Sequence, residues 1–127
     1  WITLDQSVTF VLDSLNAMRG GEIFVPKIPS MRVTDMAEAL APEAELKVIG
    51  IRPGEKLHEV LLTEDESRHA VETETSYVVE PEYAFWGYEA REGTSPEPGF
   101  RYASDTNTEW LTVDELRSMA SDVQAVA

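Results

Sequence analysis

Short apolar runs, each followed by proline or a Pro-Gly turn, constrain the fold of this chain more than any other feature. Three runs are typical of strands: residues 22–25, 46–51 and 77–79. Pro26 and Pro81 close the first and third runs, because proline cannot donate to a strand ladder. Three short strands separated by long segments do not make a sheet on their own. The pattern therefore predicts part of an α/β protein, with helices alternating with short strands, and not a complete doubly wound domain.

Capping boxes mark the first and the last predicted helix. Thr3 and Gln6 have the required spacing, and so do Thr112 and Glu115. An apolar stripe at helical period follows the first box, and the pair of glycines at 20–21 ends that helix. The stripe consists of Val8, Val11, Leu12, Leu15 and Met18. The last helix continues through Leu116 and Met119.

Apolar spacing predicts two further helices. Residues 34–40 form a short helix with Thr34 as its N-cap. The side chains expected to face inward are Val33, Met36, Ala37 and Leu40. A second helical stretch begins near Glu55, with its apolar face made of Leu57, Val60 and Leu61.

Two long segments have no clean period. The acidic residues 64–74 are expected to face solvent in a loop or a frayed helix. Residues 82–107 form a long loop that is too apolar to be simply disordered. We expect this aromatic loop and the stripe of the first helix to pack against a domain absent from this chain or against another subunit, which predicts a homo-oligomer. The aromatic residues are Tyr83, Phe85, Trp86, Tyr88, Phe100 and Tyr102.

Charge and cysteine content exclude several classes of protein. With 24 acidic against 10 basic residues, the formal net charge of −14 repels phosphate backbones, so we expect no nucleic-acid partner. The chain has no Cys, which excludes disulfides and thiolate metal sites and fits a cytoplasmic location. No apolar run approaches the roughly 20 residues of a membrane span, so no membrane partner is expected. Because the chain starts at Trp1 and not at Met, we expect it to begin inside a longer protein.

The strongest candidate for chemistry is the Arg-Pro-Gly-Glu-Lys string at residues 52–56. It follows an apolar run, at the edge of an α/β sheet where ligands collect. Arg52 offers planar, bidentate donors that suit phosphate oxygens, and Glu55 could accept hydrogen bonds from the hydroxyls of a ribose. The alternative is a surface turn in which the Arg pairs with a neighbouring Glu.

The two histidines are weaker evidence for a functional site. His58 and His69 could act as bases or metal ligands, but without Cys or a second His at helical spacing we expect no metal. His58 lies beside the Arg52 string and is the better candidate for a ligand contact. The 127 residues contain no Gly-rich dinucleotide fingerprint, no P-loop and no Tyr followed four residues later by Lys. We therefore expect no catalytic residue and no cofactor site in this chain.

Three strings of the sequence resemble one family. They are Gly-Glu-Ile-Phe-Val-Pro-Lys-Ile-Pro-Ser-Met at 21–31, Ile-Gly-Ile-Arg-Pro-Gly-Glu-Lys-Leu-His-Glu at 49–59, and Tyr-Ala-Ser-Asp-Thr-Asn at 102–107. They are similar to the inverting UDP-N-acetylglucosamine 4,6-dehydratases, which are extended short-chain dehydrogenase/reductases at the start of bacterial pseudaminic acid biosynthesis. The membrane-anchored retaining relatives typically carry an acidic turn where this chain has Pro-Lys-Ile-Pro at 26–29.

The resemblance implies a specific division of labour. In such enzymes an N-terminal Rossmann domain binds NADP and supplies the catalytic residues, and the C-terminal part closes over the UDP-sugar. Residues 1–127 would then be the C-terminal nucleotide-sugar-binding part alone, inactive by itself. By similarity Arg52 meets the diphosphate of UDP-N-acetylglucosamine and Glu55 its ribose, with Lys56, Leu57 and His58 along the same wall. The competing hypothesis is a free-standing acidic α/β binding or assembly module without enzymatic activity.

Overall fold

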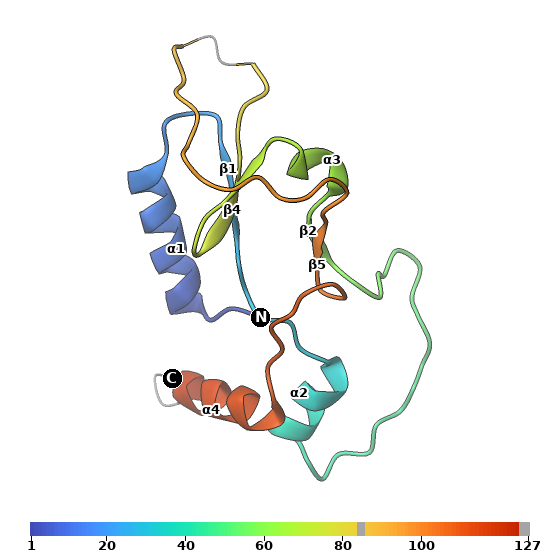
Figure 1. Ribbon diagram of the computed structural model, residues 1–127. Coiled ribbons are helices and arrows are strands. Elements are labelled where there is room, and N and C mark those ends of the chain that lie inside the picture. Colours follow the sequence, from blue (N-terminus) through green and yellow to red (C-terminus); the bar gives the residue numbers. More distant parts are fainter. Residues whose placement is uncertain (84–85, 125–127) are drawn as a thin grey trace.

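The computed structural model describes residues 1–83 and 86–124. Short helices and strands alternate along the chain, which confirms the predicted α/β class (Figure 1). The elements are α1 (Leu4–Ala17), β1 (Ile23–Pro26), α2 (Val33–Leu40), β2 (Val60–Leu62), α3 (Glu64–Ser67), β3 (Ala70–Glu72), β4 (Ser76–Val79), β5 (Tyr102–Ala103) and α4 (Val113–Gln124). None of the described helices is long and apolar enough to cross a membrane.

Helix α1 begins and ends close to where the sequence predicts. The Thr3 hydroxyl accepts from the Gln6 N–H at 3.2 Å and the Gln6 side chain accepts from the Thr3 N–H at 2.9 Å, so the capping box is formed. The helix ends at Ala17, three residues before the glycine pair. Its apolar stripe is exposed over the described part of the chain, with Leu15 58% accessible. The stripe is therefore unburied within this chain, as the sequence predicts.

Two antiparallel sheets form the centre of the molecule. In the larger one β4 lies between β1 and β3, with Phe24 opposite Val78 and Val71 opposite the same residue on the other side. The predicted strands at 22–25 and 77–79 are confirmed as β1 and β4. The smaller sheet pairs β2 with β5.

The hydrophobic core lies between the two sheets. Tyr77 of β4 stacks at tilted angles on Phe100 and Tyr102, with ring centroids 5.1 and 5.2 Å apart. Leu62 of β2 is fully buried against this group. Further members of the cluster are Val25, Val79 and Ala70. The core thus contains residues from each of the five strands named above and joins the two sheets.

Two predictions on the segment between α2 and β2 are wrong. Residues 46–51 form no strand, and their side chains are exposed, with Val48 93% accessible. A strand needs a partner for its N–H and C=O groups, and the structure pairs this run with no described segment. The predicted helix starting near Glu55 is also absent, because residues 60–62 enter β2 and pair with β5. Leu57, Val60 and Leu61 have helical spacing in the sequence, but Val60 and Leu61 lie in the short strand β2.

Smaller corrections concern α2. Its N-cap is Arg32 and not Thr34, whose hydroxyl instead donates to the Asp35 carboxylate at 3.3 Å. Val33 is 77% accessible, whereas Ala39 is buried, and α4 runs beside this helix. The predicted inward face is therefore right in part: Met36 and Ala37 are half-buried, whereas Val33 and Leu40, the latter 54% accessible, face outward.

The acidic run contains more structure than the sequence predicts. A capping box of Thr63 and Glu66 starts the single-turn helix α3. Strand β3 follows, with Ala70 and Val71 buried against β4, so residues 64–74 are not a solvent-facing loop throughout. Acidic neighbours on both sides mask these two apolar residues in the sequence.

The C-terminal end matches its prediction. The Thr112 and Glu115 side chains complete a third capping box, and α4 follows. The aromatic loop is long, and two of its aromatic residues, Phe100 and Tyr102, pack into the core of this same chain. Trp86 lies over the turn at Gly20 and Gly21. Phe85 lies outside the described residues.

Candidate substrate-binding site

A pocket of about 450 Å³ lies where three distant segments of the chain meet. These segments are residues 28–33 after β1, residues 56–61 leading into β2, and residues 102–107 at β5. They include parts of all three strings that carry the family resemblance. The lining residues are Trp1, Ile28, Pro29, Ser30, Met31, Val33, Lys56, Leu57, Glu59, Leu61, Tyr102, Ala103, Ser104 and Asn107. We call this cavity the three-segment pocket.

Among the described hydrogen bonds, the first two strings are linked to each other only through the third. The Tyr102 hydroxyl donates to the Ile28 carbonyl at 2.8 Å and accepts from the Ile28 N–H at 2.8 Å. On the other side, the Ser104 N–H donates to the Glu59 carbonyl at 2.8 Å, and the Ser104 hydroxyl accepts from the Glu59 N–H at 3.0 Å. Residues 102–104 therefore hold both the Ile28 wall and the Glu59 wall.

The pocket has the composition of a small-molecule site. Its walls are mostly apolar, with Leu57, Leu61 and Met31 among them, and a few polar groups converge on the same space. Burial raises the pKa of the Tyr102 phenol above its usual range, which favours the protonated hydroxyl that donates to Ile28. Lys56 supplies a positive charge and forms an ion pair with Glu59 at 3.4 Å.

Of the five predicted binding residues, Lys56 and Leu57 line this pocket, whereas Arg52, Glu55 and His58 do not. Those three lie on the exposed connection between α2 and β2, which we call the arm (residues 42–58). It extends away from the rest of the molecule in Figure 1. The chain thus brings the charged string next to the pocket in sequence, but the structure does not place Arg52 in its walls.

The Arg52 string does form the predicted turn. The Glu55 N–H donates to the Arg52 carbonyl at 3.0 Å, and Gly54 adopts a φ of 87°, where glycine is favoured. The Arg52 N–H donates to the Glu55 carboxylate at 2.6 Å, and the Arg52 Nε lies 3.9 Å from the same group. Arg52 therefore pairs with its neighbouring Glu, as the surface-turn alternative describes. Its role toward a ligand stays a prediction.

The remaining candidates contribute no site. Within residues 1–83 and 86–124, no group of three or more His, Asp or Glu residues is arranged to hold a metal ion. His69 bonds through its backbone, to Glu66 and Glu80. A larger cavity of about 500 Å³ lies between α1 and the sheet, but it contains none of the predicted binding residues, so we place the site at the three-segment pocket.

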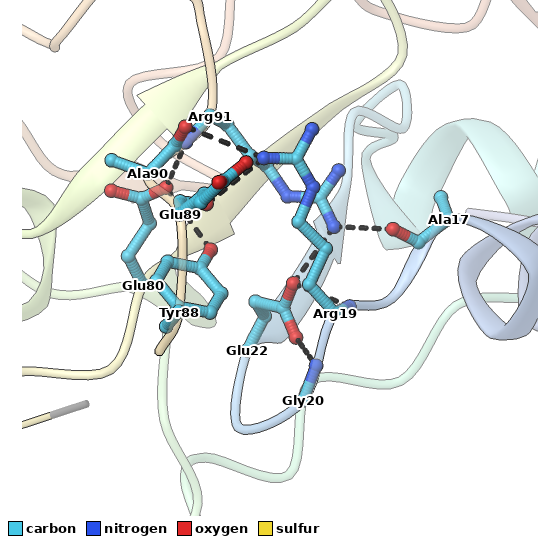
Figure 2. A network of polar contacts seen from close by, with 9 residues as sticks. All are labelled: Ala17, Arg19, Gly20, Glu22, Glu80, Tyr88, Glu89, Ala90 and Arg91. Carbon is cyan, nitrogen blue, oxygen red and sulfur yellow. Dashed lines mark hydrogen bonds and ion pairs between the residues drawn. The ribbon is translucent and has the colours of Figure 1, made fainter. Parts of the chain in front are cut away.

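A second polar network lies away from the pocket and holds the aromatic loop (Figure 2). The Glu22 side chain is completely buried and pairs with Arg91 at 2.8 Å. Glu22 also accepts from the N–H groups of Arg19 at 2.8 Å and Gly20 at 2.7 Å. Burial raises the pKa of Glu22, but these hydrogen bonds outweigh it and hold the pKa below its ordinary value. We call this pair the Glu22–Arg91 latch.

Arg91 extends the latch to three parts of the chain. Its guanidinium donates to the Ala17 carbonyl at the end of α1 and lies over the Phe24 ring, 5.1 Å from the centroid. Its backbone N–H donates to Glu80 at 2.6 Å, and Glu80 also accepts from the Tyr88 hydroxyl at 3.1 Å. No local pattern in the sequence marks the latch, because its partners lie 69 residues apart.

Comparison with known proteins assigns a family to this architecture. The family described as "Polysaccharide biosynthesis protein" matches residues 1–81, which is more than half of the chain. The chain therefore belongs to this family. The match spans the first two of the three strings that line the pocket.

Particular relatives agree with the resemblance seen in the sequence. Two proteins of Campylobacter jejuni, from serotypes O:2 and O:23/36, are each named UDP-N-acetylglucosamine 4,6-dehydratase (inverting). They are 44% and 43% identical over 91% of this chain and 37% of their own length. An uncharacterized membrane protein of Methanocaldococcus jannaschii is 40% identical over 63% of this chain and 27% of its own. The chain thus spans little more than a third of the dehydratases that it matches.

A solved structure shares the fold. The X-ray structure of Pen from Bacillus thuringiensis superimposes with a TM-score of 0.77 and 28% sequence identity. The superposition covers 97% of this chain and 38% of that protein. The fold of residues 1–127 is therefore one that occurs as part of a longer protein.

Proposed function

We propose that this chain is the nucleotide-sugar-binding part of a UDP-N-acetylglucosamine 4,6-dehydratase of the inverting kind. The observation that carries the proposal is the convergence of three strings, far apart in sequence, on the three-segment pocket. The similarity to the two Campylobacter enzymes supports the substrate class. The full enzyme would be a hydro-lyase that makes a UDP-4-keto-6-deoxy-sugar for pseudaminic acid or a related surface glycan.

The proposed ligand contacts divide between the arm and the pocket. Arg52 would exchange its intramolecular partner Glu55 for the diphosphate, whose oxygens accept the two parallel N–H bonds of a guanidinium. Glu55, released from Arg52, would accept from the ribose hydroxyls. Lys56 and Leu57 already line the pocket, with His58 next to them in sequence. Because Arg52 and Glu55 bond to each other in the described structure, this exchange breaks only local contacts.

The chemistry itself would be carried outside residues 1–127. NADP would accept and return the hydride, but this sequence has no fingerprint that fits a dinucleotide, so no residue of this chain is assigned to that step. An N-terminal Rossmann domain would hold the cofactor, and the isolated 127 residues would be inactive. The exposed stripe of α1 supports a further covering partner, which we propose to be that domain or another subunit of a homo-oligomer. A nucleotide-sugar substrate and the absence of Cys support a cytoplasmic location.

The test is UDP affinity, measured by calorimetry on the full-length protein that contains this chain. We expect Arg52→Ala to weaken UDP binding by about 2 kcal/mol, roughly 30-fold in Kd, because a charge-assisted contact to phosphate is lost. Arg52→Lys should not restore the affinity, since an ammonium cannot form the bidentate contact. NADP affinity should stay unchanged.

His69→Ala is the matched control, because the hydrogen bonds described for His69 are made by its backbone. It should bind UDP as wild type does. If Arg52→Ala bound UDP as tightly as wild type, the string at 52–56 would be a surface turn only, and the binding assignment would be withdrawn.

A further inference from the structure

The Asn107 amide is one of several groups that hold the wall of the three-segment pocket at residues 28–30. The Tyr102 hydroxyl bonds to both backbone groups of Ile28, and the Ser30 backbone bonds to Glu109 and Leu111. The Asn107 Nδ2 donates to the Ile28 carbonyl at 2.7 Å and to the Ser30 hydroxyl at 3.2 Å. Pro29 stands between these two residues and has no N–H with which to hold itself. Asn107 therefore bridges both sides of the proline, and its side chain is the one described side chain that bonds to both Ile28 and Ser30.

Asn107 is itself held by several further hydrogen bonds. Its Oδ1 accepts from the Glu109 N–H at 3.1 Å, and its backbone N–H donates to the Ala103 carbonyl at 3.0 Å. Its own carbonyl accepts from the indole of Trp110 at 2.8 Å. If the Asn107 amide were flipped, its Oδ1 would face the Ile28 carbonyl oxygen, and both atoms are acceptors. The hydrogen bonds therefore fix the orientation of the amide. The side chain is rigid before any ligand arrives.

The opposite wall depends on the same short segment. Ser104, three residues before Asn107, holds the backbone of Glu59 through two hydrogen bonds. The distance between the Ile28 wall and the Glu59 wall is therefore set by the path of the chain from 102 to 107, with Tyr102 and Asn107 on the Ile28 side and Ser104 on the Glu59 side. No hydrogen bond that the structure describes joins residues 28–30 directly to residues 56–61.

We propose that Asn107 is a positioning residue for nucleotide-sugar binding, which sets the width of the pocket by fixing residues 28–30 against Glu59. The inference rests on the proposed function and adds a residue that is neither charged nor a nucleophile. Asn107 directs both amide hydrogens at the protein, so it acts through the wall and not by direct contact with a substrate. Displacing a substrate-positioning group by about 1 Å can cost about 100-fold in rate, so a rigid wall has a measurable effect.

The experiment compares three variants of the full-length enzyme by KM, kcat and melting temperature. Asn107→Ala removes both donors, and Tyr102→Phe removes the second donor to the Ile28 carbonyl while keeping the ring. Val78→Ala is the stability control, since Val78 is buried in β4 and does not line the pocket. We expect about a tenfold rise in KM for UDP-N-acetylglucosamine in Asn107→Ala, a smaller rise in Tyr102→Phe, and an unchanged KM in Val78→Ala.

The melting temperature separates positioning from simple support of the fold. If Asn107→Ala and Tyr102→Phe lowered the melting temperature as Val78→Ala does but left KM unchanged, the positioning role would be refuted. If Asn107→Ala did not fold, Tyr102→Phe alone would decide between the same two outcomes. Binding of UDP to the wild-type protein is measured in parallel. Failure of wild type to bind UDP would overturn the proposed function itself, whereas binding with unchanged KM in both variants would overturn only this inference.

Discussion

Two long connections of this chain are built in opposite ways. The aromatic loop between β4 and β5 is held to distant parts of the fold, through the Glu22–Arg91 latch and through the bond from the Glu72 N–H to the Thr94 carbonyl at 2.8 Å. In the arm between α2 and β2, every hydrogen bond and ion pair that the structure describes joins residues three apart. The loop is bonded to distant parts of the fold, whereas the arm has only local bonds and meets the rest of the molecule at its end, where Lys56 and Leu57 line the pocket.

This contrast predicts that the aromatic loop contributes to the stability of the fold and the arm to ligand binding. Buried, fully bonded charges such as Glu22 contribute to holding a single conformation, and removing a partner from them is strongly destabilising. The arm carries the charged string expected to meet the ligand, and its side chains can exchange partners at little cost because solvent already surrounds them. Substitutions in the loop should therefore change unfolding, and substitutions in the arm should change binding.

The largest effect should come from breaking the latch. Arg91→Ala leaves the carboxylate of Glu22 buried without its cation, which costs about 3 kcal/mol of unfolding free energy. Urea denaturation followed by tryptophan fluorescence measures this cost in the full-length protein, and Trp86 reports locally because it packs on Gly20 and Gly21. UDP affinity should be unchanged.

Arg117→Ala is the control for the latch, since the ion pair of Arg117 with Asp114 on α4 is largely exposed. It should leave stability near that of wild type. An Arg91→Ala protein as stable as Arg117→Ala would show that the latch contributes nothing to folding and would remove the contrast between loop and arm.

A smaller effect should appear in the dependence of stability on pH. The pKa of Glu22 lies below its ordinary value of 4.5 in the folded protein, so its carboxylate stabilises the fold above about pH 4.5. This contribution is lost as the pH falls through the folded pKa. The melting temperature of wild type should therefore exceed that of Glu22→Gln most clearly at neutral pH, and the gap should narrow in acid. A gap of constant size from pH 7 to about pH 3 would refute the assignment.

The sequence predicts those elements whose signals are local. Capping boxes locate α1 and α4, and closing prolines locate β1 and β4. Residues 46–51 have the composition of a strand, but whether a strand forms depends on a pairing partner that local pattern does not reveal. Strand β3 escapes prediction for the opposite reason, since the partner strand β4 selects Ala70 and Val71 from an acidic stretch.

In the candidate site, too, the feature with a local sequence signal is predictable, and the residues whose partners are distant are not. The Arg52 string is recognisable because a charged turn of this kind has a characteristic sequence, and the turn is confirmed. Local pattern assigns no role to Ser104 or Asn107, and only the family resemblance of residues 102–107 draws attention to them. Asn107 meets Ile28 across 79 residues, and a polar residue in a loop has no periodic pattern to reveal its partner. Besides that resemblance, the tendency of Asn to bond backbone groups in loops is a general signal that could have suggested it.

The smallest effect on stability, and the sharpest test of the contrast, comes from adding one methyl group to a glycine in each region. Gly54 lies in the arm at a φ of 87°, and a Cβ built there meets no atom within 4 Å. Gly54→Ala therefore causes only local backbone strain of about 1 kcal/mol, which the arm, whose described hydrogen bonds and ion pairs are all local, relieves by moving. We expect an unchanged melting temperature. UDP binding should weaken about fivefold, because the turn that orients Arg52 shifts.

Gly93, in the aromatic loop, is the matched control for this substitution. A Cβ there would lie 2.2 Å from the Val71 side chain and 3.1 Å from the Glu72 carbonyl oxygen, beside the bond that joins Glu72 to Thr94. Gly93→Ala must displace β3 or the loop, so the melting temperature of this variant should fall and its UDP affinity should stay unchanged. The two alanines should thus give opposite results in the same pair of measurements. If Gly54→Ala lowered the melting temperature instead, the arm would be packed in the full-length protein, and the separation of binding from stability would fail at that point.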